Sequence, residues 1–186
     1  MQMESLKDLL AEELKDLYNA ENQILKALPK MIKKANHQEL KSAFQEHLTV
    51  TEHQVERLEQ VAKQVGVALR GKTCQGMKGI IEEGKEWMDE DAEPATMDAG
   101  LIAAAQKVEH YEIAGYGCAR TYAQTLGFHE AARLLEETLV EEEQTDRRLT
   151  QIAEGLINLE AAEEEVEVGG SMRGAGRGVG RRGRGG

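Results

Sequence analysis

Four stretches of this chain carry apolar residues at the three- and four-residue spacing of a helix seam, and polar residues interrupt each seam near its middle. Burying a lone carboxylate is so unfavourable that the group normally takes up a proton or stays in water. Several carboxylates that converge on one layer therefore need a shared counter-charge, and we expect a pair of metal ions. The interrupting residues, in chain order, are Glu21; His47, Thr51 and Gln54; Glu109 and Glu112; and Glu142 and Asp146.

The same stretches predict an all-α protein. Leu, Ala, Glu, Lys and Gln dominate a chain that has only two prolines, and no segment shows the alternation of β-branched residues that is typical of strands. Asn36, Gly66 and Gly127 mark predicted helix ends, because these residue types tolerate the left-handed backbone that closes a helix. We expect helices over about residues 4–35 and 37–65, a third that begins near 96 or 98, and a fourth that follows Gly127 and ends near 159.

The lengths of the connections predict how these helices are arranged. The first and third connections are only a few residues long, which forces each joined pair to lie antiparallel. The middle connection spans residues 67–97 and contains a short amphipathic stretch at 73–89. A crossover of this length permits up-down-down-up connectivity. We therefore predict a ferritin-like antiparallel four-helix bundle whose long crossover contains a short fifth helix.

Charge divides the chain into a body and a tail. The net charge is −11, but residues 169–186 hold five arginines, nine glycines and no acid, which leaves −16 on residues 1–168. Such a segment cannot bury a core, so we predict a bundle over residues 1–165 and a disordered Gly/Arg-rich tail over 166–186. The acidic body does not favour nucleic acid, whereas five arginines permit weak, non-specific binding to nucleic acid or another polyanion.

The sequence predicts a cytoplasmic protein with no membrane partner. Residues 1–10 carry three charged side chains and no apolar signal core, and no apolar run reaches membrane length. Cys74 and Cys118 show no ligand-like spacing and cannot form a disulfide framework, so we expect reduced thiols.

The candidate metal ligands are carboxylates with one imidazole. The two residues of each pair in the third and fourth stretches are three or four positions apart, so both share one helix face. Hard or borderline divalent metals prefer these donors, which indicates one or two ions of iron or manganese rather than thiolate-bound zinc. A boundary position is the alternative for each glutamate, and a satisfied core histidine is the alternative for the imidazole. The candidate set is Glu21, His47, Glu109, Glu112, Glu142 and Asp146.

Four segments resemble the YciF/YciE family of small bacterial ferritin-like proteins, once labelled a domain of unknown function. They are DLYNAENQILKALPKM, HLTVTEHQVERLEQV, LIAAAQKVEHYEIAGYG and LVEEEQTDRRL, and the resemblance covers about residues 4–160. It implies a homodimer, a connection to stress responses and a two-metal centre, with a manganese-catalase-like activity among the possibilities. By position, the family's motif glutamates fall on Glu21, Glu109, Glu112 and Glu142, and its second-helix histidine falls on His47.

One position departs from the pattern that we expect of this family. Where members should read HLEET or HLSET, this chain reads HLTVT, which puts Val50 in the place of a motif glutamate. That glutamate would bridge or terminate the metal pair. The alternatives are a single metal, a rearranged pair that uses Asp146 or water, or an inert structural centre.

Two hypotheses for the function follow. The first is a cytoplasmic, dimeric, metal-binding stress protein that acts on peroxide or oxygen, with Tyr18, Tyr111 or Tyr116 as candidate redox or proton partners. The second is a non-enzymatic helical dimer with a degenerate metal site, which associates with nucleic acid or another polyanion through its basic tail.

Overall fold

The computed structural model describes residues 3–163, and these residues form helices connected by short loops without any β-strand. The all-α prediction is therefore confirmed for this part of the chain. The tail predicted over residues 166–186 lies outside the described residues. The elements are α1 (Leu6–Lys34), α2 (Gln38–Val65), α3 (Gln75–Asp89), α4 (Pro94–Thr125), α5 (His129–Ile152) and a π-helical turn, η1 (Ala153–Ile157).

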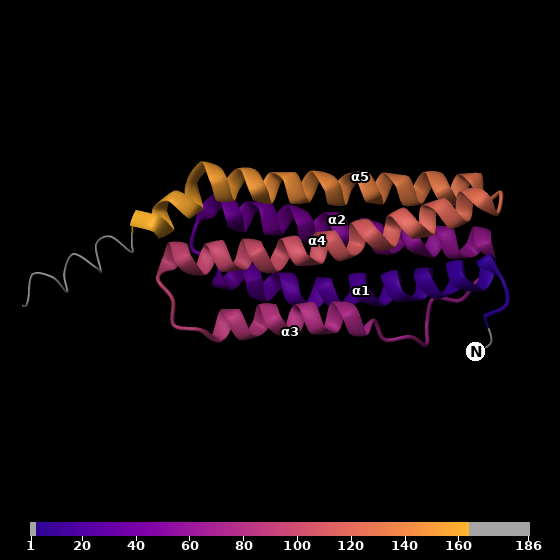
Figure 1. Cartoon of the computed structure of the whole chain (residues 1–186), viewed down its shortest axis with the longest axis horizontal. Helices are drawn as coiled ribbons and strands as arrows, with labels where there is room; N and C mark the ends of the chain where they lie inside the picture. The colour runs from indigo at the N-terminus through magenta and orange to yellow at the C-terminus, as the bar shows by residue number, and fades with distance from the viewer. Residues whose placement is uncertain (1–2, 164–186) are drawn as a thin grey trace, which may run out of the picture.

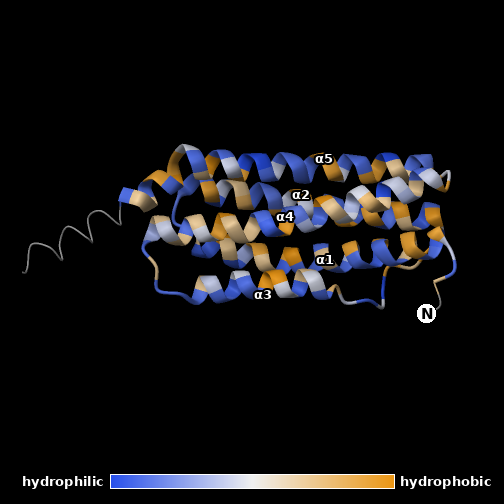
Figure 2. Cartoon of the chain, viewed as in Figure 1, coloured by the Kyte–Doolittle hydropathy of each residue, from blue (hydrophilic) through white to orange (hydrophobic). Residues whose placement is uncertain are grey.

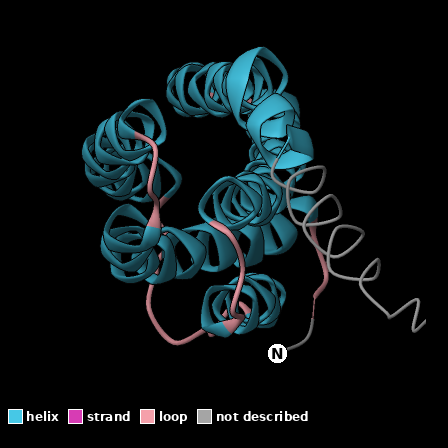
Figure 3. Cartoon of the chain, turned by 90° about the vertical axis from the view of Figure 1, so that its left-hand side faces the viewer, coloured by secondary structure: helices cyan, strands magenta, loops and turns pink. Residues whose placement is uncertain are grey.

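Four of the helices form the predicted bundle (Figure 1). α1 packs against α2 and α4, and α5 packs against the same two helices from the other side. α1 and α2 are antiparallel, as are α4 and α5, whereas α2 and α4 run in the same direction (Figure 1). α3 fills the crossover and packs outside the bundle against α1 and α4, as the end-on view shows (Figure 3). The up-down-down-up connectivity and the fifth helix are thus confirmed.

The helix ends confirm two of the three predicted stop signals. Gly66 and Gly127 adopt the left-handed conformation, with φ of 77° and 80°. Asn36 does not adopt this conformation: among the described residues, only glycines have a positive φ. Its backbone N–H instead donates to Asp98 Oδ1 at 2.8 Å, which orders the turn by a tertiary contact. α4 begins at Pro94, earlier than expected, because proline needs no hydrogen bond in the first turn of a helix.

The apolar core is divided into two clusters along the bundle axis. Every bundle helix carries both hydrophilic and hydrophobic residues (Figure 2), and no described helix is long and apolar enough to cross a membrane. On each bundle helix the polar seam residues lie between the segments that supply the two clusters. One cluster includes Ile24, Leu28, Leu40, Phe44, Leu101, Ile102 and Leu149. The other includes Leu10, Leu14, Leu17, Leu58, Val61, Tyr116 and Leu135.

Asp98 joins the α1–α2 turn to the start of α4. Its side chain is buried, and its carboxylate accepts hydrogen bonds from the backbone N–H groups of Asn36 at 2.8 Å and His37 at 2.7 Å. We predict that Asp98→Ala lowers the free energy of unfolding by about 3 kcal/mol, because the backbone N–H groups of Asn36 and His37 lose a charged acceptor. Urea denaturation followed by circular dichroism measures this loss. Asp89→Ala, at an exposed position on α3, is the control, and a loss below about 1 kcal/mol for Asp98→Ala would contradict the assignment.

Candidate metal centre

The layer between the two apolar clusters receives side chains from all four bundle helices. α1 contributes Glu21, α2 contributes His47, α4 contributes Glu109 and Glu112, and α5 contributes Glu142. Each helix presents these residues on the seam that also carries its core residues, so the seam periodicity buries them. The exposed fraction of each is between 0 and 3%.

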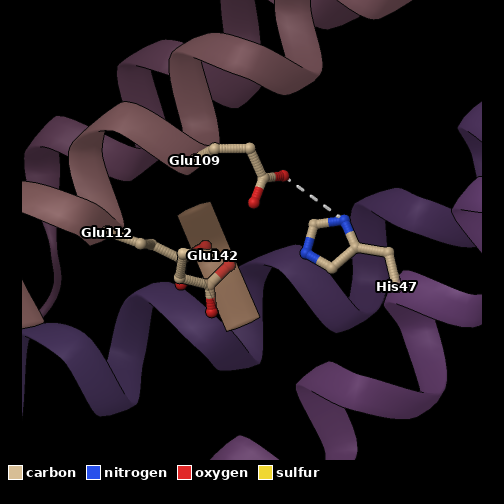
Figure 4. Close-up of side chains that lie close together, drawn as sticks. All are labelled: His47, Glu109, Glu112 and Glu142. Atoms are coloured by element: carbon tan, nitrogen blue, oxygen red, sulfur yellow. Dashed lines mark ion pairs between the residues drawn. The ribbon is translucent and has the colours of Figure 1, made fainter. Parts of the chain in front are cut away.

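Four of these residues form a compact cluster. His47, Glu109, Glu112 and Glu142 each offer one ligand atom, and these atoms all lie within 4.8 Å of one another. The side chains come from three helices and point toward a common space (Figure 4). His47 Nδ1 lies 3.4 Å from Glu109 Oε1. This arrangement of one imidazole and three carboxylates can place four ligands around a single ion.

Most polar atoms of the cluster lack a hydrogen-bond partner. Both ring nitrogens of His47, both carboxylate oxygens of Glu109 and of Glu112, and Oε2 of Glu142 are buried and unsatisfied among the described residues. Each such group normally costs about 1–3 kcal/mol and is rare in folded proteins. A cation at the centre would take one ligand atom from each of these residues, so the donor set fits a metal ion.

The same burial changes the protonation of the cluster. Burial, followed by the charge of neighbouring glutamates, raises the pKa of Glu109 and of Glu112 well above its usual range. Burial raises the pKa of Glu142 to about 7 and lowers the pKa of His47 to about 4. Without a cation, protons therefore neutralise part of the cluster. A divalent ion would take the place of these protons, as it does wherever carboxylates become ligands.

Glu21 lies at the edge of this cluster. Tyr116 Oη donates a short hydrogen bond to Glu21 Oε1, and Glu21 Oε2 is buried without a partner. Burial and the charge of Glu142 raise the pKa of Glu21 well above its usual range. The other two candidate tyrosines bond elsewhere: Tyr18 Oη donates to Glu59 at 3.3 Å and Tyr111 Oη donates to Asp16 at 2.6 Å.

The structure places Asp146 apart from the four-residue cluster. Its side chain is 21% exposed and lies 3.3 Å from His110 Nε2. Gln106 Nε2 donates to Asp146 Oδ1 at 3.0 Å. Asp146 and Glu142 share a helical seam, but these partners from α4 hold Asp146 near the surface of the bundle.

Gln54 supports the cluster through a hydrogen bond that its place in the sequence does not predict. Its Nε2 donates to Glu142 Oε1 at 2.5 Å and to Glu141 Oε2 at 3.1 Å. Arg57 fixes the Glu141 carboxylate with hydrogen bonds of 2.8 Å and 2.9 Å. The position of Gln54 on the polar seam was the available signal, but its partner on α5 is visible only in the folded chain.

Val50 lies one turn beyond His47 on α2. It is partly buried and lines a groove between α2 and α5 that also reaches His47 and Glu141. A carboxylate at position 50 would therefore approach the cluster from the side of α5. Glu52 and His53, on the same helix, are exposed.

The raised carboxyl pKa values give the metal-free protein a characteristic pH dependence. The unfolded chain releases these protons at a lower pH than the folded chain does. The free energy of unfolding therefore falls as pH rises toward the folded-state pKa. Between pH 6.5 and 8, the titration of Glu142 alone should lower the free energy of unfolding by about 1 kcal/mol, and the other buried glutamates act in the same direction. His47, with its lowered pKa, acts in the opposite direction, but above pH 6.5 it adds less than about 0.5 kcal/mol, because the unfolded histidine is already half deprotonated there.

We therefore predict that metal-free protein is less stable at pH 8 than at pH 6.5, and that Glu142→Gln reduces this difference by about 1 kcal/mol. Urea denaturation at the two pH values, in the presence of chelator, measures it. Glu143→Gln, at the neighbouring, partly exposed position, is the matched control. Stability that is constant or increases over this range would contradict the buried, proton-bearing cluster.

Comparison with known proteins places the fold in a family. The model of the family described as Domain of unknown function (DUF892) matches residues 5–162. YciF of Escherichia coli (strain K12) is 42% identical over 162 residues, which cover 87% of this chain and 98% of that protein.

Solved structures agree with this match. The crystal structure of the E. coli stress protein YciF has a TM-score of 0.81 at 42% identity, and the match covers 84% of this chain and 99% of that one. YcfI from Rhodopseudomonas palustris has a TM-score of 0.79 at 41% identity, and the match covers 82% of this chain and 97% of that one. A protein from Xanthomonas campestris shares the fold, with a TM-score of 0.68 at 20% identity. The match covers 87% of this chain and 99% of that one. This chain belongs to the DUF892 family and is a homologue of YciF.

Proposed function

We propose that this protein binds iron or manganese between His47, Glu109, Glu112 and Glu142 and acts on peroxide or oxygen during stress. The observation that carries the proposal has two parts: each of these four residues offers one ligand atom within 4.8 Å of the other three, and all four carry buried polar atoms without hydrogen-bond partners. Carboxylates with one imidazole suit iron and manganese. The relative from E. coli is named a stress protein, which supports the cellular setting.

The geometry favours one tightly held ion. The four clustered residues provide ligands for one site, whereas Glu21 lies at its edge and keeps a single unpartnered oxygen. A second ion would depend on Glu21 and on a further donor, and Val50 cannot provide one. One divalent ion offsets two of the negative charges, so protons on the remaining glutamates balance the rest.

The residues around the cluster have distinct roles in this proposal. Gln54 orients Glu142 by donating to it, and Tyr116 holds a proton at Glu21 Oε1. The apolar clusters on both sides keep bulk water away, which strengthens the electrostatic interactions of the ligands. Bound iron or manganese would supply electron exchange with peroxide or oxygen. We extend the proposal to a homodimer, as the family resemblance implies, and to a cytoplasmic location.

Metal content tests the proposal directly. Protein purified without chelator and reconstituted anaerobically with Fe(II) or Mn(II) should contain about one metal ion per chain by elemental mass spectrometry. Glu109→Ala removes a ligand at the centre and should reduce the content to background, while Glu52→Ala, at an exposed position on α2, should retain it. Metal content in wild type no higher than in Glu109→Ala would refute metal binding at this site.

The same measurement on Val50→Glu tests the role of position 50. If a carboxylate on the α5 side of His47 completes a second site, this variant should bind about two ions per chain. An unchanged content of about one would show that position 50 does not limit the stoichiometry.

The charge division of the chain favours a second candidate function. We propose that the five arginines of residues 169–186, attached to a body of opposite charge, allow weak association with nucleic acid or another polyanion. This role does not require the metal ligands. It matches the alternative of a non-enzymatic helical dimer whose metal site is degenerate.

Fluorescence anisotropy with a single-stranded RNA separates the two functions. The full chain should bind the RNA, and a plot of log binding constant against log salt concentration should have a slope no steeper than about −3.5. This limit holds because five arginines neutralise at most five phosphates. Deletion of residues 169–186 should abolish binding, and Glu109→Ala should leave it unchanged. Binding that survives the deletion would assign the interaction to the bundle.

A further inference from the structure

An apolar pocket leads from the surface to the cluster of His47, Glu109, Glu112 and Glu142. It lies between α1, α3 and α4, has a volume of about 240 Å³, and reaches His47 and Glu109 at its inner end. These two residues are buried at 3% and 0% exposure, so the pocket extends into the bundle.

The walls of the pocket are aliphatic. They include Ile24, Met31, Ile81, Met88, Ala105 and Val108, which come from three different helices. The pocket is larger than an engineered apolar cavity of about 150 Å³ that binds benzene. Its aliphatic walls run from partly exposed residues near the surface to buried residues at the inner end, and this favours an extended aliphatic chain.

Three lysines line the mouth of this pocket. Lys26 and Lys30 lie on α1 and Lys85 lies on α3, and all three are exposed. None of them forms an ion pair within residues 3–163, although the body of the chain carries an excess of acidic residues. Apart from these lysines, the only charged or titratable side chains that line the pocket are His47 and Glu109 at its inner end.

We propose that the pocket binds a medium-chain aliphatic carboxylate. The carboxylate lies at the lysines of the mouth, where it gains a charged partner in contact with water. The hydrocarbon chain lies between the aliphatic walls, where its apolar surface is removed from water. Its far end faces His47 and Glu109. This inference goes beyond the proposed function, because it depends on the pocket and its lysines and not on a bound metal.

Calorimetric titration of the metal-free full chain with decanoate tests the proposal. We expect saturable binding of one decanoate per chain. 1-Decanol, which lacks the charge, and decyltrimethylammonium, which reverses it, should bind at least fivefold more weakly. Because the protein is metal-free, failure of the metal proposal would leave this result unaffected.

Two sets of variants locate the ligand. The triple variant Lys26→Ala, Lys30→Ala and Lys85→Ala should weaken decanoate binding at least fivefold. Its matched control replaces Lys33, Lys34 and Lys78, which are exposed on the same two helices outside the pocket, and should bind as wild type does. Ala27→Leu places a larger side chain in the pocket and should weaken the binding of both decanoate and 1-decanol.

Three outcomes would overturn the assignment. The first is no saturable binding of decanoate. The second is equal binding of decanoate and decyltrimethylammonium, or of wild type and the triple lysine variant, which would show that charge at the mouth plays no part. The third is binding that weakens as protein concentration rises, which would show that a second copy of the chain covers the pocket.

Discussion

The electrostatic cost of placing four glutamates in one buried layer governs the rest of this structure. Glu21, Glu109, Glu112 and Glu142 are fully buried, and each has at least one carboxylate oxygen without a hydrogen-bond partner. Protons or cations must offset their charge, because the interior cannot hold it unpaired. The layer also divides the apolar core, so each half of the bundle packs as a separate cluster. Stability and metal affinity are therefore opposed at these positions: the groups that weaken the metal-free fold are those that would bind a cation.

The connectivity explains how one layer receives ligands from every bundle helix. Antiparallel pairing places the midpoints of joined helices at the same depth, and the crossover through α3 brings α4 beside α1 (Figure 1). Asp98 fixes the depth of α4 by holding the α1–α2 turn. The two glutamates of α4 consequently lie level with His47. A meandering bundle would change the neighbours of α4 and separate these side chains.

Seam periodicity predicted the fold and much of the buried layer, because burial follows the helical repeat. It could not separate Glu142 from Asp146, since both lie on one seam of α5 and differ only in the residues that face them. Gln54 donates to the first, whereas Gln106 donates to the second. Asn36 shows the same limit: its residue type allows a left-handed helix end, but a buried carboxylate 62 positions away determines its backbone. Local pattern predicts which face is buried, and tertiary partners decide what each buried group does.

His47 lies where two routes of different chemistry meet. The pocket between α1, α3 and α4 is aliphatic with lysines at its mouth, whereas the groove between α2 and α5 contains Glu46, Glu141 and two arginines. Val50 lines only the second route, so a carboxylate at this position would change the α5 side of the cluster and leave the aliphatic pocket as it is. The two routes to His47 are therefore formed by largely different residues, so a substitution that alters one need not alter the other.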